Sequence, residues 1–168
     1  MFNHIPYFYY QNRRMNHSNV PLRNHQLNHF NRDYGPQPYV VNIDSATKNN
    51  QSFRKALWTG GHLQVTLMSI DVGDDIGLEI HPQNDQFLRI EQGQGLVQVG
   101  DQPNHLTYVQ HVQQDDAIII PAGKWHNLLN TGPIPLKLYS IYAPPHHPHG
   151  TVHETKAIAI AAEEHHHY

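Results

Sequence analysis

The sequence of 168 residues contains no cysteine. Disulfide bonds, thiolate nucleophiles and thiolate metal ligands are therefore excluded. The sequence also lacks any run of about 18 consecutive apolar residues, the length that a membrane-spanning helix needs. Residues 1–14 contain Tyr, Asn and Arg where a secretory signal would need an apolar stretch. These absences predict a soluble protein of the cytoplasm with no membrane partner.

Charged residues are scarce as well, at 15% of the chain, and the net charge is -3. The charge is uneven, because residues 1–36 carry four Arg against Asp33, a local +3 that leaves -6 for the remainder. A nucleic-acid-binding protein would need a denser basic patch or an aromatic stacking platform. Neither is present in the apolar middle of the chain, so no nucleic-acid partner is expected.

The length predicts one domain, and the composition divides the chain into four segments. Residues 1–36 are rich in Asn, His, Tyr and Arg without any sustained periodicity, which predicts a disordered tail, with an assembly segment as the alternative. Residues 37–61 form a lead-in segment. Residues 62–143 form the globular part, and residues 144–168 form a His-rich extension.

Two short helices are expected outside the globular part. Asp44 could cap one in the lead-in segment. Pro144 and Pro145 end the preceding strand, and Thr155 could cap an Ala-rich helix that runs to Glu164.

The globular part consists of short β-rich runs separated by turn residues. The expected strands are residues 62–71, 76–81, 86–92, 95–99, 106–112, 117–121, 126–130 and 135–143. Short strands at this spacing, with no helix between them, favour an all-β antiparallel barrel or jelly roll.

Two stretches within these runs have a regular motif spacing. The first contains Gly73, Glu79, His81, Gln86 and Gly93, and the second contains Pro121, Gly123, His126 and Asn130. Together they resemble the two motifs of the cupin superfamily, over about residues 60–145. The resemblance implies a small single-domain cupin, a double-stranded β-helix of the jelly-roll type, which commonly forms a homodimer. The chain departs from the usual pattern at Glu79, which replaces a His, at Gln86, which replaces a Glu, and at Asp115, which replaces a Gly.

Strand parity selects the candidate ligands. Glu79 and His81 are two residues apart and share a face. Asp85 and Gln86 both fall within the tolerance of the motif, but Gln86 shares its face with two apolar residues, so Gln86 is expected to point inward. With His126, the predicted metal ligands are Glu79, His81, Gln86 and His126.

Two imidazoles, one carboxylate and one amide oxygen suit a single divalent transition metal ion, Mn, Fe, Co, Ni or Zn. The same residue types, with Glu and Gln exchanged, form the zinc site of cupin-type phosphomannose isomerases. A buried carboxylate needs a partner, and no Lys or Arg lies on the predicted inward faces to pair with Glu79. The alternative is a metal-free barrel whose inward polar residues bond one another.

Further residues could complete the pocket. Candidates on the first and last strands of the globular part are Gln64, Thr66, Met68, Tyr139 and Tyr142. The His-rich extension could supply a second metal site or a lid through His146, His147, His149 and His153.

The resemblance implies a metal-dependent enzyme acting on a small polar substrate, of the dioxygenase or sugar isomerase type. No general acid or base other than the ligands is evident inside the barrel, so a mobile His could supply the proton. The alternative is a non-catalytic barrel that binds a metal or small ligand. A structural protein assembled through its Tyr-, Asn- and His-rich ends, for example in a spore or envelope layer, is a further alternative.

Overall fold

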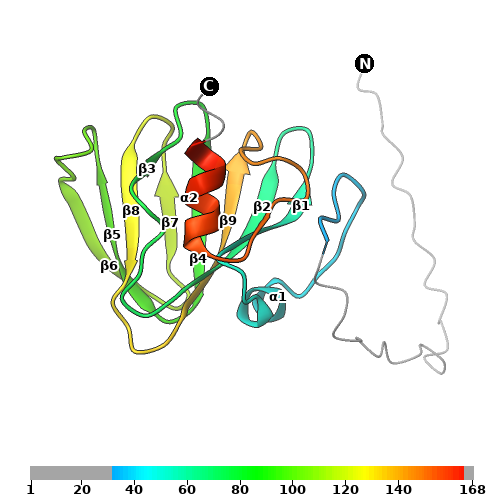
Figure 1. The fold of residues 1–168 in the computed structure, drawn as a ribbon, viewed down its shortest axis with the longest axis horizontal. Helices are drawn as coiled ribbons and strands as arrows, with labels where there is room; N and C mark the ends of the chain where they lie inside the picture. The colour runs from blue at the N-terminus through cyan, green and yellow to red at the C-terminus, as the bar shows by residue number, and fades with distance from the viewer. Residues whose placement is uncertain (1–31, 165–168) are drawn as a thin grey trace, which may run out of the picture.

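A computed structural model describes residues 32–164, which form two β-sheets and two helices (Figure 1). The six-stranded sheet has the order β10-β1-β2-β9-β4-β7, and the four-stranded sheet has the order β3-β8-β5-β6. The strands are β1 (Arg54–Thr59), β2 (Gln64–Ile70), β3 (Glu79–Ile80), β4 (Asp85–Gln92), β5 (Gln94–Gly100), β6 (Tyr108–Gln113), β7 (Ala117–Ile120), β8 (Trp125–Asn130), β9 (Leu136–Ala143) and β10 (Val152–His153).

The predicted all-β jelly roll is confirmed, but the predicted barrel is not closed. Within the described residues the two sheets remain separate, and every assigned strand pair is antiparallel. β1, in the lead-in segment, pairs along β2 and extends the larger sheet toward β10. Most of the predicted N-terminal tail (1–31) and the last four residues of the His-rich extension lie outside the described residues.

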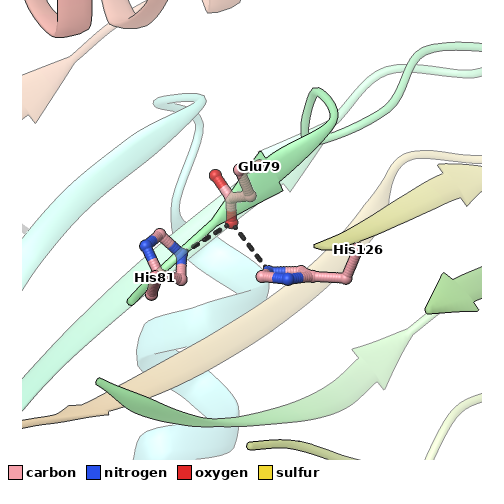
Figure 2. A group of neighbouring side chains, drawn as sticks. All are labelled: Glu79, His81 and His126. Carbon is pink, nitrogen blue, oxygen red and sulfur yellow. Dashed lines mark hydrogen bonds and ion pairs between the residues drawn. The ribbon is translucent and has the colours of Figure 1, made fainter. Parts of the chain in front are cut away.

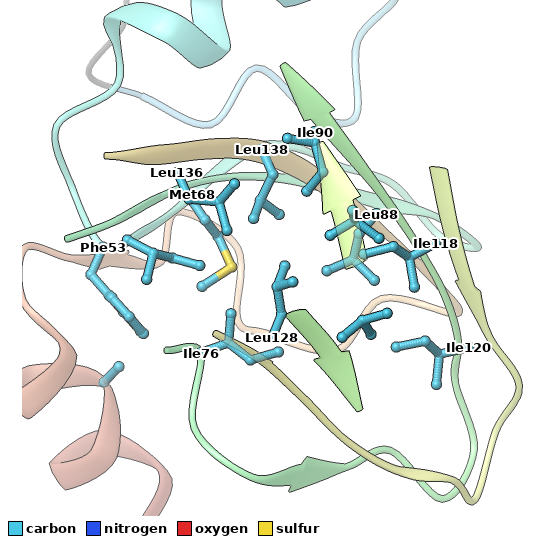
Figure 3. Packing of buried hydrophobic residues seen from close by; sticks show 14 residues of the cluster. Phe53, Met68, Ile76, Leu88, Ile90, Ile118, Ile120, Leu128, Leu136 and Leu138 are labelled. Carbon is cyan, nitrogen blue, oxygen red and sulfur yellow. The ribbon is translucent and has the colours of Figure 1, made fainter. Parts of the chain in front are cut away.

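The core lies between the two sheets (Figure 3). Apolar residues alternate along the strands, so one face of each strand is buried. Both sheets contribute fully buried side chains, such as Met68 and Leu138 from the larger sheet and Val97 and Leu128 from the smaller one. Burial of each such side chain contributes roughly 1.5–3 kcal/mol to the hydrophobic driving force.

The inner face of the larger sheet becomes polar at one end. Tyr142 lies in register with Gln64 on β2 and with Gln86 on β4, and all three side chains are almost fully buried. The next row contains Thr66 opposite Ser140, and the rows beyond it are apolar. The candidate site lies at this polar end.

The opposite face of the larger sheet is covered by a second apolar cluster. Leu57 and Leu67 pack there with α1 (Ile43–Asn49) and with Tyr34, whose ring stacks on Tyr39 at 4.0 Å between ring centroids. Asn42 caps α1 by accepting a hydrogen bond from the Ser45 amide at 2.9 Å. The helix expected here is present, but the predicted cap was misplaced, because Asp44 lies in the first turn.

α2 (Lys156–Glu164) is the expected C-terminal helix, and the Thr155 hydroxyl accepts a hydrogen bond from the Ile158 amide at 3.3 Å. Ala159 packs into the core between the sheets. The described residues contain no helix that is long and apolar enough to cross a bilayer.

Two turn positions explain parts of the motif pattern. Gly123 has φ +78°, a conformation that favours glycine. Asp115, where the cupin pattern has glycine, has φ +73° and is the one non-glycine residue with positive φ in the described chain. Aspartate tolerates this region better than most residues, and its carboxylate binds Arg89 at 2.8 Å. The fold therefore keeps the left-handed turn without the glycine.

Candidate metal centre

Glu79, His81 and His126 converge at the polar end of the sandwich (Figure 2). β3 pairs with β8, which places Glu79 directly opposite His126. Oε1 of Glu79 lies 3.2 Å from Nε2 of His81 and 3.3 Å from Nε2 of His126. One potential ligand atom from each residue lies within 4.8 Å of the others. Two motifs separated by a long stretch of sequence thus supply three metal-type ligands to one point.

The backbone fixes the orientation of His126. Its Nδ1 lies 3.0 Å from the carbonyl oxygen of Lys124, so Nδ1 carries a proton and donates it there. Nε2 of His126 faces the carboxylate of Glu79, where it either carries a second proton or presents a lone pair. Two acceptors cannot face each other at 3.3 Å without a proton or a cation between them. A divalent metal ion satisfies this arrangement, so the residues present fit such an ion.

Arg54 contacts the other side of Glu79. Its Nη2 donates to Oε2 of Glu79 at 3.2 Å, and its Nη1 donates to Oε1 of Glu163 at 2.6 Å. Burial opposes ionisation of Glu79, but its contacts with His126 and His81 and the charge of Arg54 outweigh burial and hold its pKa well below the usual range.

The predicted inward faces offered no Lys or Arg to pair with Glu79, but Arg54 reaches Glu79 from outside those faces. Arg54 lies in the lead-in segment, outside the predicted barrel, and enters the interior because this segment forms β1. Part of the countercharge that Glu79 requires is thus supplied by the protein itself.

Gln86 points inward, as the parity of β4 indicates, and its side chain is buried. Its amide nitrogen donates to the Ser140 hydroxyl at 3.1 Å, while its amide oxygen has no partner within the described residues. The oxygen is the atom that would bind a metal. Asp85 instead lies outside and accepts a hydrogen bond from the Ala122 amide at 2.9 Å. The role of Gln86 as a fourth ligand stays a prediction.

Two residues of the His-rich extension pack beside the site. The His146 ring lies 4.2 Å from the His81 ring and 4.7 Å from the His147 ring, measured between centroids. Gln64 holds this segment, because its amide accepts from the His147 backbone N–H at 2.9 Å and donates to the His147 carbonyl at 2.8 Å. Burial, with the nearby His81, lowers the pKa of His146 to about 4. Burial, with Arg54, lowers the pKa of His147 to about 2.

The other two histidines lie elsewhere. His149 is exposed and contacts the Gly35 carbonyl at 3.1 Å. His153 lies on β10, opposite Arg54 in the sheet register. The four histidines therefore do not gather into one group, and Glu79, His81 and His126 form the one candidate cluster found in residues 32–164. The predicted second metal site has no support in this part of the chain.

The predicted pocket residues divide between two faces. Tyr142 lies next to the site, with its ring 5.3 Å from that of His81. Gln64 and Thr66 are buried on the same inner face, and Met68 belongs to the apolar core. Tyr139 does not line the pocket, because it packs in the cluster on the opposite face. Tyr139 and Tyr142 are an odd number of residues apart, so one strand presents them to opposite sides.

Comparison with known proteins identifies the class to which this sandwich and its convergent ligands belong. The Cupin domain family matches residues 66–142. YrkC of Bacillus subtilis (strain 168) is 66% identical over 133 residues, which cover 79% of this chain and 72% of YrkC. A protein of Acanthamoeba polyphaga mimivirus is 41% identical over 118 residues, covering 69% of this chain and 71% of that protein.

A solved structure matches as well. BH2720 from Bacillus halodurans superposes with a TM-score of 0.77 at 68% identity, covering 77% of this chain and 98% of that one. The chain belongs to the cupin family.

Proposed function

We propose that this protein binds one divalent transition metal ion through Glu79, His81 and His126, with Gln86 as the fourth ligand. The observation that carries the proposal is the approach of three acceptor-type atoms, Oε1 and two Nε2, to one point. The unpartnered oxygen of Gln86 supports the fourth position. Oxygen and imidazole donors suit Mn, Fe, Co, Ni or Zn.

We propose further that the metal-loaded protein is an enzyme acting on a small polar substrate, of the dioxygenase or isomerase type. A bound metal ion with an open position would polarise a substrate oxygen. His146 and His147 are neutral near pH 7, because burial lowers the pKa of each, so their rings could form hydrogen bonds with a substrate beside the site without carrying charge. Burial raises the pKa of Tyr142, so its hydroxyl stays protonated and can donate a hydrogen bond.

A non-catalytic barrel that binds a small ligand is the second candidate. The buried contact of Arg54 with Glu79 favours it, because this pair compensates the carboxylate without a metal. Homodimer formation and a cytoplasmic location, with a spore or envelope layer as the alternative, stay predictions.

Elemental analysis of the purified full chain tests the first step. We expect about one transition metal ion per chain after loading and dialysis. A chain that retains none would contradict the metal proposal and favour the second candidate. Oxygen-uptake and sugar-isomerase assays on the loaded protein then test the enzyme proposal, and a metal-loaded protein inactive in both would contradict the reaction types named above.

A further inference from the structure

Arg54 is shared between two carboxylates that come from distant parts of the chain. It is 1% exposed and lies on β1, outside the two motifs. One partner, Glu79, belongs to the candidate metal centre, and the other, Glu163, lies near the end of α2 and is 45% exposed. The guanidinium therefore connects the C-terminal helix to the carboxylate that faces the two imidazoles.

α2 is held at its first turn by a separate set of contacts. Lys156 pairs with Asp74 at 2.7 Å and with Asp75 at 2.5 Å, in the loop that precedes β3. Ala159 is buried in the core. The helix thus pairs with the loop before β3 through its first turn and with Arg54 on β1 through Glu163.

The charges at this centre determine what Glu163 contributes. Arg54 and Glu79 alone have a net charge of zero, so the pair would offer little attraction to a divalent cation. With the charge of Glu163 included, the group of Arg54, Glu79 and Glu163 has a net charge of -1. Glu163 also competes for the guanidinium, which leaves more of the charge of Glu79 available to a cation near Oε1. Solvent weakly screens the interaction of the buried Arg54 with Glu79, whereas it screens the charge of the half-exposed Glu163 more strongly, so the contribution of Glu163 is a modest one.

We propose that Glu163 is a positioning residue for the metal centre, acting through Arg54 to raise the affinity of Glu79, His81 and His126 for a divalent cation. This inference rests on the proposed function. By reciprocity, a cation at the centre holds the Glu163 end of α2 more firmly against Arg54, because both effects have one coupling free energy. The stability of the C-terminal end of α2 thereby depends on whether the metal site is occupied.

Cobalt titration of the full chain tests the proposal, because Co²⁺ absorbs visible light and its spectrum reports the coordination geometry. Glu163→Gln keeps the size of the side chain and removes its charge, and we expect its Co²⁺ affinity to fall by about 5- to 10-fold. Glu163→Asp, which restores the charge, should recover part of this loss. Lys156→Met is the matched control, because it loosens the other end of α2 and leaves Arg54 paired.

The outcomes separate the two proposals. Wild-type protein that binds no Co²⁺ contradicts the proposed function as well as this inference. Wild-type protein that binds Co²⁺ with the same affinity as Glu163→Gln contradicts the inference alone. An equal loss in Lys156→Met also contradicts it, because helix docking and not the carboxylate would then set the affinity.

Hydrogen exchange supplies an independent measurement of the same coupling. Amides near Glu163 should exchange more slowly in the Co²⁺-loaded wild type than in the metal-free protein, and this difference should shrink in Glu163→Gln. Unchanged exchange in a wild type shown to bind Co²⁺ would overturn the reciprocal part of the proposal. Unaltered far-ultraviolet circular dichroism of each variant checks that the fold is intact.

Discussion

The two oxygens of Glu79 face two different regions of the molecule. Oε1 faces His81 and His126, which come from the two cupin motifs. Oε2 faces Arg54, which comes from a strand outside them and is supported by α2. The motif side supplies ring nitrogens that can bind a cation, whereas the other side supplies a permanent cation. We therefore expect the affinity of the proposed metal site to depend on residues that the motifs do not contain.

The largest expected effect is a loss of stability when Arg54, the cation beside Oε2 of Glu79, is replaced. Arg54→Met leaves Glu79 buried without its charged partner, and breaking such a pair costs about 3–5 kcal/mol. Urea denaturation measures the loss. Added Zn²⁺ should restore part of the stability, because it compensates the same carboxylate.

Arg89→Met is the control for that measurement. Its side chain is 36% exposed where it pairs with Asp115, and the expected cost is below about 1 kcal/mol. Equal losses in the two variants would show that Glu79 does not depend on Arg54.

On the motif side, His126→Ala should lower metal affinity by about 100-fold or more, because it removes a ligand from a site with few others. Elemental analysis of the loaded and dialysed variant measures this. His111→Ala, an exposed histidine on β6, should retain the metal. Full occupancy in His126→Ala would exclude the proposed centre.

A smaller loss of metal affinity is expected when the proposed fourth ligand, Gln86, is removed. Gln86→Ala should weaken metal binding by about 10-fold, whereas Asp85→Ala should leave it unchanged, because Asp85 lies outside the sandwich. A competition titration with a chelator ranks the two variants. The reverse order would exclude Gln86 as a ligand.

A separate prediction concerns the dependence of stability on pH. The pKa of His147 falls from an ordinary value of 6.5 to about 2 on folding, so the unfolded chain binds a proton that the folded chain does not bind between these values. Stability should therefore fall as the pH drops below 6.5, and His147 alone should contribute about 1.4 kcal/mol per pH unit to this fall. Burial is the main cause of this low pKa; Arg54, His146 and His81 lower the pKa further, and Glu79 raises it.

Urea denaturation between pH 7 and pH 5 measures this slope. His147→Gln should reduce this slope, because it removes the ring that titrates. The contacts of His147 with Gln64 are made by the backbone and should persist in the variant. His149→Gln, an exposed neighbour, should keep the wild-type slope. Identical slopes in all three proteins would contradict the low pKa.

The fold was largely predictable from the sequence, for physical reasons. Alternating apolar residues and closely spaced turns determine the strands. The motif spacing brings Glu79, His81 and His126 together because β3 and β8 pair in one register. Tyr139 was misplaced, although the parity of a single strand was sufficient to exclude it from the inner face.

The support of the site was not predictable in the same way. Arg54 lies 25 residues from Glu79 and 109 residues from Glu163 along the chain. No local periodicity relates residues at such separations, and only the pairing of β1 with β2 and the docking of α2 bring them together. The packing of His146 against His81 likewise depends on the path of the chain after β9.

The segment that carries His146 and His147 is anchored on both sides. Gln64 bonds the backbone of His147 on one side, and the buried carboxylate of Asp33 accepts from the Gly150 amide at 3.0 Å on the other. A segment fastened in this way opens seldom, and opening requires these bonds to break together. We therefore expect a chelator to remove a bound ion from beside His81 at a rate that depends on how often this segment opens.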